Sequence, residues 1–459
     1  MIRDTKLKTD LKKILSIALP IIAQCMVSYA LVLIDTAFIG NYNLEGLFAI
    51  NNVIIPFFAL TSFFFAFSQG LTIILSQLMG ANKVKTAKRA CENAFLYNQL
   101  ISLLYFVFWM SFGEDILFMI GARDQVLILA TQYLTVLSFS FLFTGLSLTS
   151  VAIFQGLGKT TPIMISSIIK SILNIVFNWV LIFGNLGFPE MGLKGAAIGT
   201  VLSDLIGTTY LFIALINYKE FAMRLSGVLN PRLQYFKRII KISLPIGIEY
   251  VLWHSGQVFI IFLLNKISSA AAGAFGIVNV LIGLSFNLYM GIGIATLVLV
   301  GNAIGAKQMK YAFRIGNLSL LISLFICTII STIFVLYPIN ILTTFTEDKQ
   351  FIEMLVIYVP FLCLIIFPKA VNVISGYALK GSADTQWQMI NQAFGTVIIV
   401  ILSWYLVINL QMGFSGILWA IFIDEAWRAA ANYLRFLSKY CDLKVFQLIK
   451  REAKLDLGA

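Results

Sequence analysis

The chain has 459 residues, of which 59% are hydrophobic and only 12% are charged, and its formal net charge is +12. Soluble domains carry about 25% charged residues, so this composition excludes a soluble globular protein and indicates a polytopic membrane protein. The five cysteines are scattered and show no CxxC spacing, which favours neither a disulfide framework nor a zinc site. The basic charge therefore bears on membrane orientation rather than on nucleic-acid binding.

Apolar segments long enough to cross a bilayer recur twelve times along the chain. Each of them must be helical, because hydrocarbon offers the backbone N–H and C=O groups no water partners. The sequence therefore predicts an all-α polytopic membrane protein with twelve transmembrane helices. The predicted spans cover about residues 14–39, 46–78, 92–113, 126–150, 161–187, 195–217, 239–265, 269–303, 315–338, 353–378, 386–409 and 414–437.

Lys and Arg residues gather on one side of these spans when the N-terminus is placed in the cytoplasm. Of the 33 basic residues, three lie within spans and only Arg123, Lys194, Lys266 and Lys349 fall in the external loops. The excess of basic residues on the other side predicts that both termini are cytoplasmic. We expect a multi-pass protein of the inner (cytoplasmic) membrane.

An internal repeat with a spacing of 225 residues relates the two halves of the chain. The matching pairs are Pro20 and Pro245, Gly80 and Gly305, and Gly156 and Gly381. Each half holds six spans, an even number, so the repeat is parallel and predicts two pseudo-symmetric six-helix bundles. We expect an N-lobe at 1–218, a cytoplasmic linker at 219–237 and a C-lobe at 238–459. The basic segment at 228–241 suits either a short helix on the anionic inner leaflet or a solvated connection.

Ionisable side chains within spans are functional candidates, because a buried charge in a bilayer is costly. Asp35 lies near the outer end of the first span, and Asn174, Asn178 and Thr200 reach a similar depth. A carboxylate with amide carbonyls and a hydroxyl suits a proton or a hard monovalent cation. The predicted cation-binding or coupling residues are Asp35, Asn174, Asn178, Thr200 and Asp204. The spacing leaves open whether Lys170 pairs with Asp35 or with Asp204, and a structural role alone for Asp35 is the alternative.

Charged residues also cluster in depth in the second half, where two interpretations stay open. A neutral brace of the bundle and a coupling or substrate role both fit a predicted cluster of Glu249, Lys369, Asp424, Glu425 and Arg428. Polar and aromatic candidates for lining a cavity are Gln24, Tyr29, Lys170, Trp253, Gln257 and Asn279. Aromatic side chains offer cation–π contacts to a lipophilic cation, although they also serve packing.

Motifs of enzymes do not occur in the context that their chemistry requires. No GxSxG, HExxH, Walker or CxxC pattern stands where it would function. With His254 as the single histidine, a metal site is not expected either. We therefore predict a protein that is not an enzyme and that needs no cofactor beyond H⁺ or Na⁺ as a coupling ion.

Several motifs together resemble the multidrug and toxic compound extrusion (MATE) family. They are DTAFIG in the first span, GLTIILSQLMGA closing the second, QGLGKTTP after the fourth, NIVFN in the fifth and GLKGAAIGT entering the sixth. The resemblance covers essentially the whole chain. It implies a prokaryotic secondary antiporter that exports organic cations or other amphipathic compounds in exchange for H⁺ or Na⁺ by alternating access.

The resemblance also implies roles for individual residues. Asp35, Asn174 and Thr200 match the family's cation site, whereas Asn178 replaces an aspartate that many members carry, which weakens the case for a tight Na⁺ site. Trp253 and Lys369 stand where one branch has acidic residues that bind the coupling cation. We therefore expect ion coupling to centre on the first half.

Two other functions are weighed against the antiporter. A flippase for a lipid-linked precursor would need a cationic cavity for a pyrophosphate, and only Lys170, Lys369 and Arg428 lie within spans. A membrane sensor that transports nothing would need a soluble signalling domain, which the short tails do not offer. The expected partners are small amphipathic or cationic substrates and the lipid bilayer, with no nucleic acid, and the protein is expected to be a monomer.

Overall fold

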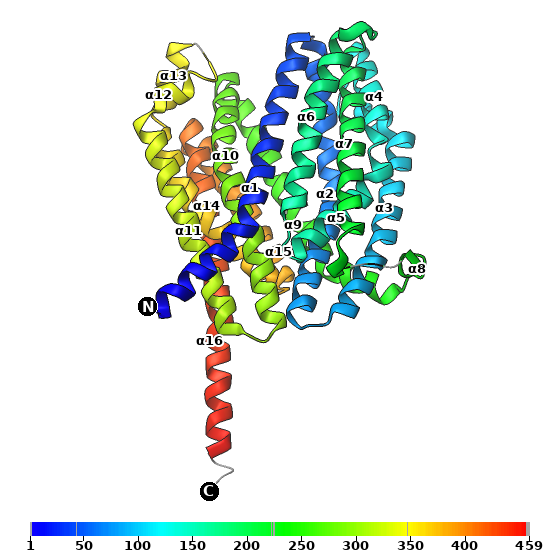
Figure 1. Ribbon diagram of the computed structural model, residues 1–459. Coiled ribbons are helices and arrows are strands. Elements are labelled where there is room, and N and C mark those ends of the chain that lie inside the picture. The colour runs from blue at the N-terminus through cyan, green and yellow to red at the C-terminus, as the bar shows by residue number, and fades with distance from the viewer. Residues whose placement is uncertain (1, 43, 222, 224, 347, 456–459) are drawn as a thin grey trace. The chain divides into compact units, whose positions relative to one another are not determined.

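The computed structural model describes residues 2–42, 44–221, 223, 225–346 and 348–455, and the regular structure in these ranges is helical throughout (Figure 1). The all-α prediction is confirmed for this part of the chain. The α-helices are α1 (Ile2–Tyr42), α2 (Leu44–Gly80), α3 (Val84–Met119), α4 (Asp124–Ser138), α5 (Phe141–Gly156), α6 (Thr161–Phe183), α7 (Gly192–Ile216), α8 (Leu225–Val228), α9 (Leu233–Ile267), α10 (Ser269–Gly305), α11 (Met309–Leu336), α12 (Pro338–Leu342), α13 (Lys349–Val356), α14 (Val359–Gly381), α15 (Thr385–Trp404) and α16 (Gly413–Leu455). Short 3₁₀ turns occupy Asn185–Gly187 and Lys219–Phe221, and a π-helical turn, Tyr405–Asn409, follows α15.

The predicted spans correspond to described helices. Within the described residues, ten helices are long and apolar enough to cross a membrane, and α4 with α5 adds an eleventh span that is bent by 54°. The twelfth predicted span begins α16, whose first 18 residues include three charged side chains, Asp424, Glu425 and Arg428. These charges explain why apolar composition alone does not mark α16 as a span.

The fourth span of each half is broken, although the sequence predicted continuous helices at 126–150 and 353–378. Between α4 and α5, the Ser138 hydroxyl donates to the Leu134 carbonyl at 2.7 Å, a bond within the helix that favours bending. Between α13 and α14, a proline stands in the first turn of α14. Proline has no N–H and restricts the residue before it, so a helix ends ahead of it.

The sequence repeat is also a repeat of backbone geometry. Asn82 and Lys307, 225 residues apart, have φ values of 58° and 59°. Gly158 and Ala383 have the same separation and φ values of 69° and 61°. A lysine and an alanine adopt the left-handed conformation here at an energetic cost that glycine would not pay. The helix ends of the two halves therefore turn in the same way.

The chain divides into two compact units. The first unit is Ile17–Tyr250, and the second unit is Met1–Ser16 with Val251–Ala459. Because the division falls inside α1 and α9, the first turns of α1 belong to the second unit. There the guanidinium of Arg314 on α11 donates to Asp10 at 2.9 Å, and the Tyr311 hydroxyl donates to the same carboxylate at 3.3 Å. The lobe limits inferred from the sequence stay a prediction.

The connection between the halves packs onto the first unit. Phe221 is buried, and the backbone N–H of Arg232 donates to the Asn93 side chain on α3. Residues 233–241, which the sequence allowed as part of a separate helix on the inner leaflet, form the first turns of α9 instead. Basic residues therefore continue directly into the seventh span.

Candidate functional site

Small residues on α7 allow α6 to approach it closely. A Cβ atom added at Gly195 would lie 2.5 Å from the Leu181 carbonyl oxygen of α6. At Gly199 it would overlap the Asn178 side chain, and at Gly207 it would overlap the Lys170 side chain. Glycines four and eight positions apart share a helix face, and small residues at this spacing are typical of close helix contacts in membranes. The missing side chains of α7 thus leave space for polar side chains of α6.

A chain of hydrogen bonds joins α1, α6 and α7. The Asn178 amide Nδ2 donates to Asp35 Oδ1 of α1 at 2.9 Å and to Asn174 Oδ1 at 3.0 Å. The Asn174 amide in turn donates to Thr200 Oγ1 of α7 at 3.2 Å. Both asparagines are buried. The structure therefore brings together the four residues that the sequence placed at one depth.

One acceptor in this hydrogen-bond network, the side-chain oxygen of Asn178, has no partner among the described residues. The Oδ1 atom of Asn178 is buried and makes no hydrogen bond to any described residue. Buried polar atoms are paired in the great majority of cases, so an unpaired one calls for an explanation. The nitrogen of the same amide binds Asp35, so the amide would have to rotate for this oxygen to face the carboxylate, where it could accept from a proton donor or contact a small cation.

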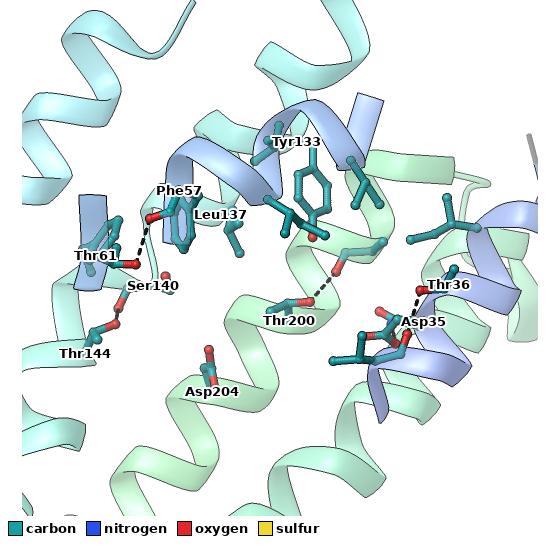
Figure 2. A pocket seen from close by; sticks show the side chains of 18 of the residues that line it. Asp35, Thr36, Phe57, Thr61, Tyr133, Leu137, Ser140, Thr144, Thr200 and Asp204 are labelled. Atoms are coloured by element: carbon teal, nitrogen blue, oxygen red, sulfur yellow. Dashed lines mark hydrogen bonds between the residues drawn. The ribbon is translucent and has the colours of Figure 1, made fainter. Parts of the chain in front are cut away.

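These residues border a cavity of about 330 Å³ inside the first unit (Figure 2). Four of the five predicted cation-site residues line it, and the fifth, Asn174, lies buried behind them. Most of the remaining wall is apolar, with rings supplied by Phe57, Phe64, Phe65, Tyr133 and Phe141. Further hydroxyl groups come from Thr36, Thr61, Ser140 and Thr144. Such a wall suits a compound with aromatic surface and positive charge.

These hydroxyl and aromatic groups were not predicted from the sequence. Ser140 lies in the break between α4 and α5, and Thr144 lies one turn further along, in α5. Tyr133 extends from α4, and Figure 2 shows its hydroxyl directed into the cavity. The four-residue spacing of Ser140 and Thr144 was the one sequence signal available, and serine and threonine occur widely in apolar spans.

Lys170 pairs with Asp204, which answers the question that the sequence left open. Its Nζ atom lies 3.2 Å from Asp204 Oδ1 and 3.4 Å from the Ser147 hydroxyl of α5. The side chain passes across α7 at Gly207, where a Cβ atom would obstruct it. Asp204 lines the cavity one turn from Thr200 (Figure 2). Lys170 is not among the residues that line it.

The six residues proposed from the sequence as a cavity lining do not border the cavity described above. Trp253, Gln257 and Asn279 belong to the second unit. In the first unit, the buried Gln24 Oε1 atom has no hydrogen-bond partner among the described residues, and Tyr29 is half-buried. Apart from Asp35, Asn178 and Asp204, the lining consists of aliphatic, aromatic and hydroxyl side chains. Any role of the six residues in substrate contact therefore stays a prediction.

In the second unit, four of the five predicted charged residues form a buried network. Lys369 Nζ lies 3.3 Å from Glu425, and Arg428 lies 3.0 Å from Asp424 and 3.1 Å from Glu425. Two cations and two carboxylates give a network without net charge. The fifth residue, Glu249, falls in the first unit, so its membership of the cluster stays a prediction.

Amide side chains surround this network and were missed by the sequence analysis. Asn372 donates to Glu425 at 2.9 Å, and Arg428 donates to Gln392 at 2.7 Å. Asn432 donates to Asn372 at 2.8 Å and accepts from Asn391 at the same distance. Buried charges are tolerated where they are paired and hydrogen-bonded in this way. The arrangement favours the interpretation as a neutral brace.

Among the described residues, no three or more His, Cys, Asp or Glu side chains lie close enough together to form a metal site.

Comparisons with known proteins identify the family to which this architecture belongs. The family model described as MatE matches the chain twice, at residues 20–180 and 245–406. The two matches begin at Pro20 and Pro245, the prolines that the internal repeat pairs.

Relatives of similar length are found among curated bacterial proteins. The probable multidrug resistance protein NorM of Thermotoga maritima is 27% identical over 453 residues, which cover 97% of this chain and 96% of the relative. The uncharacterised transporter YisQ of Bacillus subtilis is 25% identical over 415 residues, which cover 88% of this chain and 89% of the relative.

Solved structures share the fold. An outward-facing multidrug resistance MATE family transporter of the MOP superfamily superposes with a TM-score of 0.88 at 18% identity, covering 95% of this chain and 97% of the other. A MATE structure in a straight conformation gives a TM-score of 0.86 at the same identity and coverage. The predicted fold of twelve helices in two pseudo-symmetric bundles is confirmed, and so is the family inferred from the motifs. The chain therefore belongs to the MatE family, and it is a multi-pass membrane transporter rather than an enzyme.

Proposed function

We propose that this protein is a secondary active efflux antiporter, which exports organic cations or other amphipathic compounds in exchange for H⁺ or Na⁺ by alternating access. One observation carries the proposal: Asp35 lines an aromatic cavity and also accepts a hydrogen bond from the buried Asn178. A carboxylate in this position is accessible to a substrate and to a coupling ion. Relatives that are named as probable multidrug resistance proteins support the same function.

The cavity wall supports a cationic or amphipathic substrate. Its described lining includes two carboxylates, Asp35 and Asp204, and no lysine or arginine. The aromatic rings can contact the apolar body of a substrate and attract its positive charge through their faces. A pyrophosphate would meet negative charge in this cavity, so the lining favours the antiporter over a flippase for a lipid-linked precursor.

Coupling follows from competition for one carboxylate. When Asp35 is ionised it can accept the hydrogen bond from Asn178, and it can also neutralise a cationic substrate. Binding of H⁺ or Na⁺ removes that negative charge, and rotation of the Asn178 amide would present its unpaired oxygen to the ion or to the protonated carboxyl group. Since ion and substrate neutralise the same group, each promotes release of the other, and this is the requirement for antiport.

The available driving force is sufficient for this task. A difference of 100 mV in the electrochemical potential of the coupling ion is worth about 2.3 kcal/mol per ion moved. At one ion per substrate, this free energy supports roughly a fiftyfold ratio in the electrochemical gradient of the substrate. One coupling carboxylate is therefore enough for useful export, and a second ion site is not required.

The charged network of the second unit is already neutralised, which supports a passive role of that unit in ion coupling. Lys369 and Arg428 already neutralise Glu425 and Asp424, and the Asn372 amide donates to the second oxygen of Glu425. A free cation would have to displace an attached ammonium or guanidinium group from these carboxylates. We therefore place ion coupling in the first unit, at Asp35. The excess of basic residues in alternate loops supports a location in the inner membrane with both termini in the cytoplasm.

The proposal is tested with purified protein in proteoliposomes. An imposed pH gradient or Na⁺ gradient should drive transport of N-methyl-4-phenylpyridinium (MPP⁺), a small aromatic monocation, and dissipation of the active gradient should stop it. Asp35→Asn should abolish gradient-driven transport. Asp115→Asn is the matched control, because Asp115 is an exposed aspartate at the end of α3 that lies outside the cavity lining. Gradient-driven transport that survives in Asp35→Asn at the rate of this control would exclude the coupling role.

A further inference from the structure

Asp204 and Asp35 face the same cavity but differ in what binds them. Asp35 accepts a hydrogen bond from the neutral amide of Asn178, so no neighbouring cation balances its negative charge in the described contacts. Asp204 instead lies 3.2 Å from the ammonium of Lys170. The cavity therefore presents one carboxylate whose charge is available and one whose charge is already neutralised.

The structure holds Lys170 in place for this pairing. Its aliphatic chain lies against Gly207 of α7, where any larger residue would obstruct it, and its ammonium also donates to Ser147 of α5. The ammonium thus reaches Asp204 from behind the wall, because Lys170 itself does not line the cavity. The Asp204 side chain keeps 37% of its surface exposed, so it stays accessible from the cavity while it is paired.

We propose that Lys170 acts as a built-in counter-cation for Asp204 and thereby selects substrates that carry a single positive charge. This inference rests on the proposed export of organic cations and specifies their charge. With Asp35 ionised, Asp35, Asp204 and Lys170 together give a net charge of −1, which one positive charge balances. A second positive charge on the substrate would have to compete with the attached ammonium for Asp204, and repulsion of this kind is an effective source of specificity.

The test compares two probes of nearly the same shape. MPP⁺ and methyl viologen each consist of two linked six-membered rings, and they carry one and two positive charges. Their dissociation constants are measured on the purified full chain in detergent, without any gradient, with radiolabelled MPP⁺ and unlabelled competitor. The wild-type protein should bind MPP⁺ more tightly than methyl viologen. Lys170→Met should shift this preference toward the dication by about tenfold, which corresponds to roughly 1.4 kcal/mol.

Three further variants separate this role from a structural one. Lys170→Arg should keep the wild-type preference, because it retains the positive charge beside Asp204. In the double variant Lys170→Met/Asp204→Asn, the preference should return toward the wild-type value, because the freed carboxylate is gone. Lys194→Met removes an exposed lysine from the first turn of α7, the helix that carries Asp204, and it should leave the preference unchanged.

The outcomes that would overturn the proposal are distinct from those that concern coupling. Equal affinity of the wild-type protein for the two probes would overturn it, and so would an unchanged preference in Lys170→Met. Lys170→Gln gives the same readout if the methionine variant does not fold. If the wild-type protein shows this binding pattern but no gradient-driven transport, the antiport function is refuted. If it transports but Lys170→Met leaves the ratio of the two dissociation constants unchanged, only the role of Lys170 is refuted.

Discussion

Replacing Gly199 with alanine should separate Asn178 from Asp35 without changing either residue. The added methyl group would overlap the Asn178 side-chain oxygen and would lie 3.2 Å from Cβ of Phe177. The α6 backbone is also near, with the Asn178 nitrogen 3.3 Å away. The flexible end of the asparagine is therefore the group that moves.

The expected magnitude follows from the hydrogen bond that this movement breaks. Restoring an ordinary contact distance requires a displacement of about 1 Å. The bond from Asn178 to Asp35 is 2.9 Å long, and at such a displacement it no longer meets the geometric criteria. Hydrogen bonds to charged groups contribute about 1.5–3 kcal/mol. Gradient-driven transport should therefore fall by about one to two orders of magnitude.

Initial rates of MPP⁺ transport in proteoliposomes provide the assay. Gly276→Ala is the matched control, because it adds the same methyl group within helix α10, at a position where nothing lies within 4 Å. A thermal midpoint in detergent shows whether each variant is folded. Only the Gly199 variant should lose transport.

A double-mutant cycle tests whether the effect of Gly199→Ala acts through Asn178. If the defect passes through Asn178, then Gly199→Ala/Asn178→Ala should transport no worse than Asn178→Ala alone, because the two changes act on one contact. Wild-type transport by Gly199→Ala, or additive losses in the double variant, would show that the methyl group acts elsewhere and that the contact between Asn178 and Asp35 does not control coupling.

Three further predictions concern other contacts. Thr200→Val removes the acceptor of the Asn174 amide at nearly constant shape, and it should reduce transport about fivefold, as for one hydrogen bond of about 1 kcal/mol; an unchanged rate would exclude Thr200 from the site. Arg428→Met leaves the buried Asp424 without its guanidinium partner, and it should lower the free energy of unfolding by about 3–5 kcal/mol. Asp424→Leu/Arg428→Met should recover most of the lost thermal midpoint. A double variant that is as unstable as the single one would contradict this prediction. Asp10→Asn weakens the contact with the half-exposed Arg314, and it should lower the thermal midpoint by about 1–3 °C relative to Asp115→Asn. Equal midpoints of the two variants would show that this contact adds nothing to stability.

Parts of the candidate site could be predicted because a helix fixes which of its residues share a face. The spacing of Lys170, Asn174 and Asn178 placed them on one side of a helix, and counting depth from the span ends brought Asp35 and Thr200 to the same level. The hydrogen bonds from Asn178 to Asp35 and from Asn174 to Thr200 bear out that proximity.

The lining of the cavity could not be predicted in the same way. A span that is apolar on every face carries no periodicity to show which side meets a neighbouring helix. Tyr133 and Thr144 line the cavity because α4 and α5 are bent between them, and that bend was not anticipated. Gln24 and Tyr29 were named for their polarity, but Gln24 lies about 16 Å from Asp35 along α1, and the cavity is lined by Asp35 and by neither of these residues.

The sequence by itself determined the membrane class, the twelve spans, the repeat of 225 residues and the depth of each charged residue. These properties depend on composition and on distance along one chain, which apolar length and helical rise translate directly into position in a bilayer. Only the tertiary structure decided that Lys170 binds Asp204, that Asn178 binds Asp35, and that glycines of α7 make room for both α6 side chains. Those pairings depend on the rotation and close approach of neighbouring helices, and contacts between helices set both.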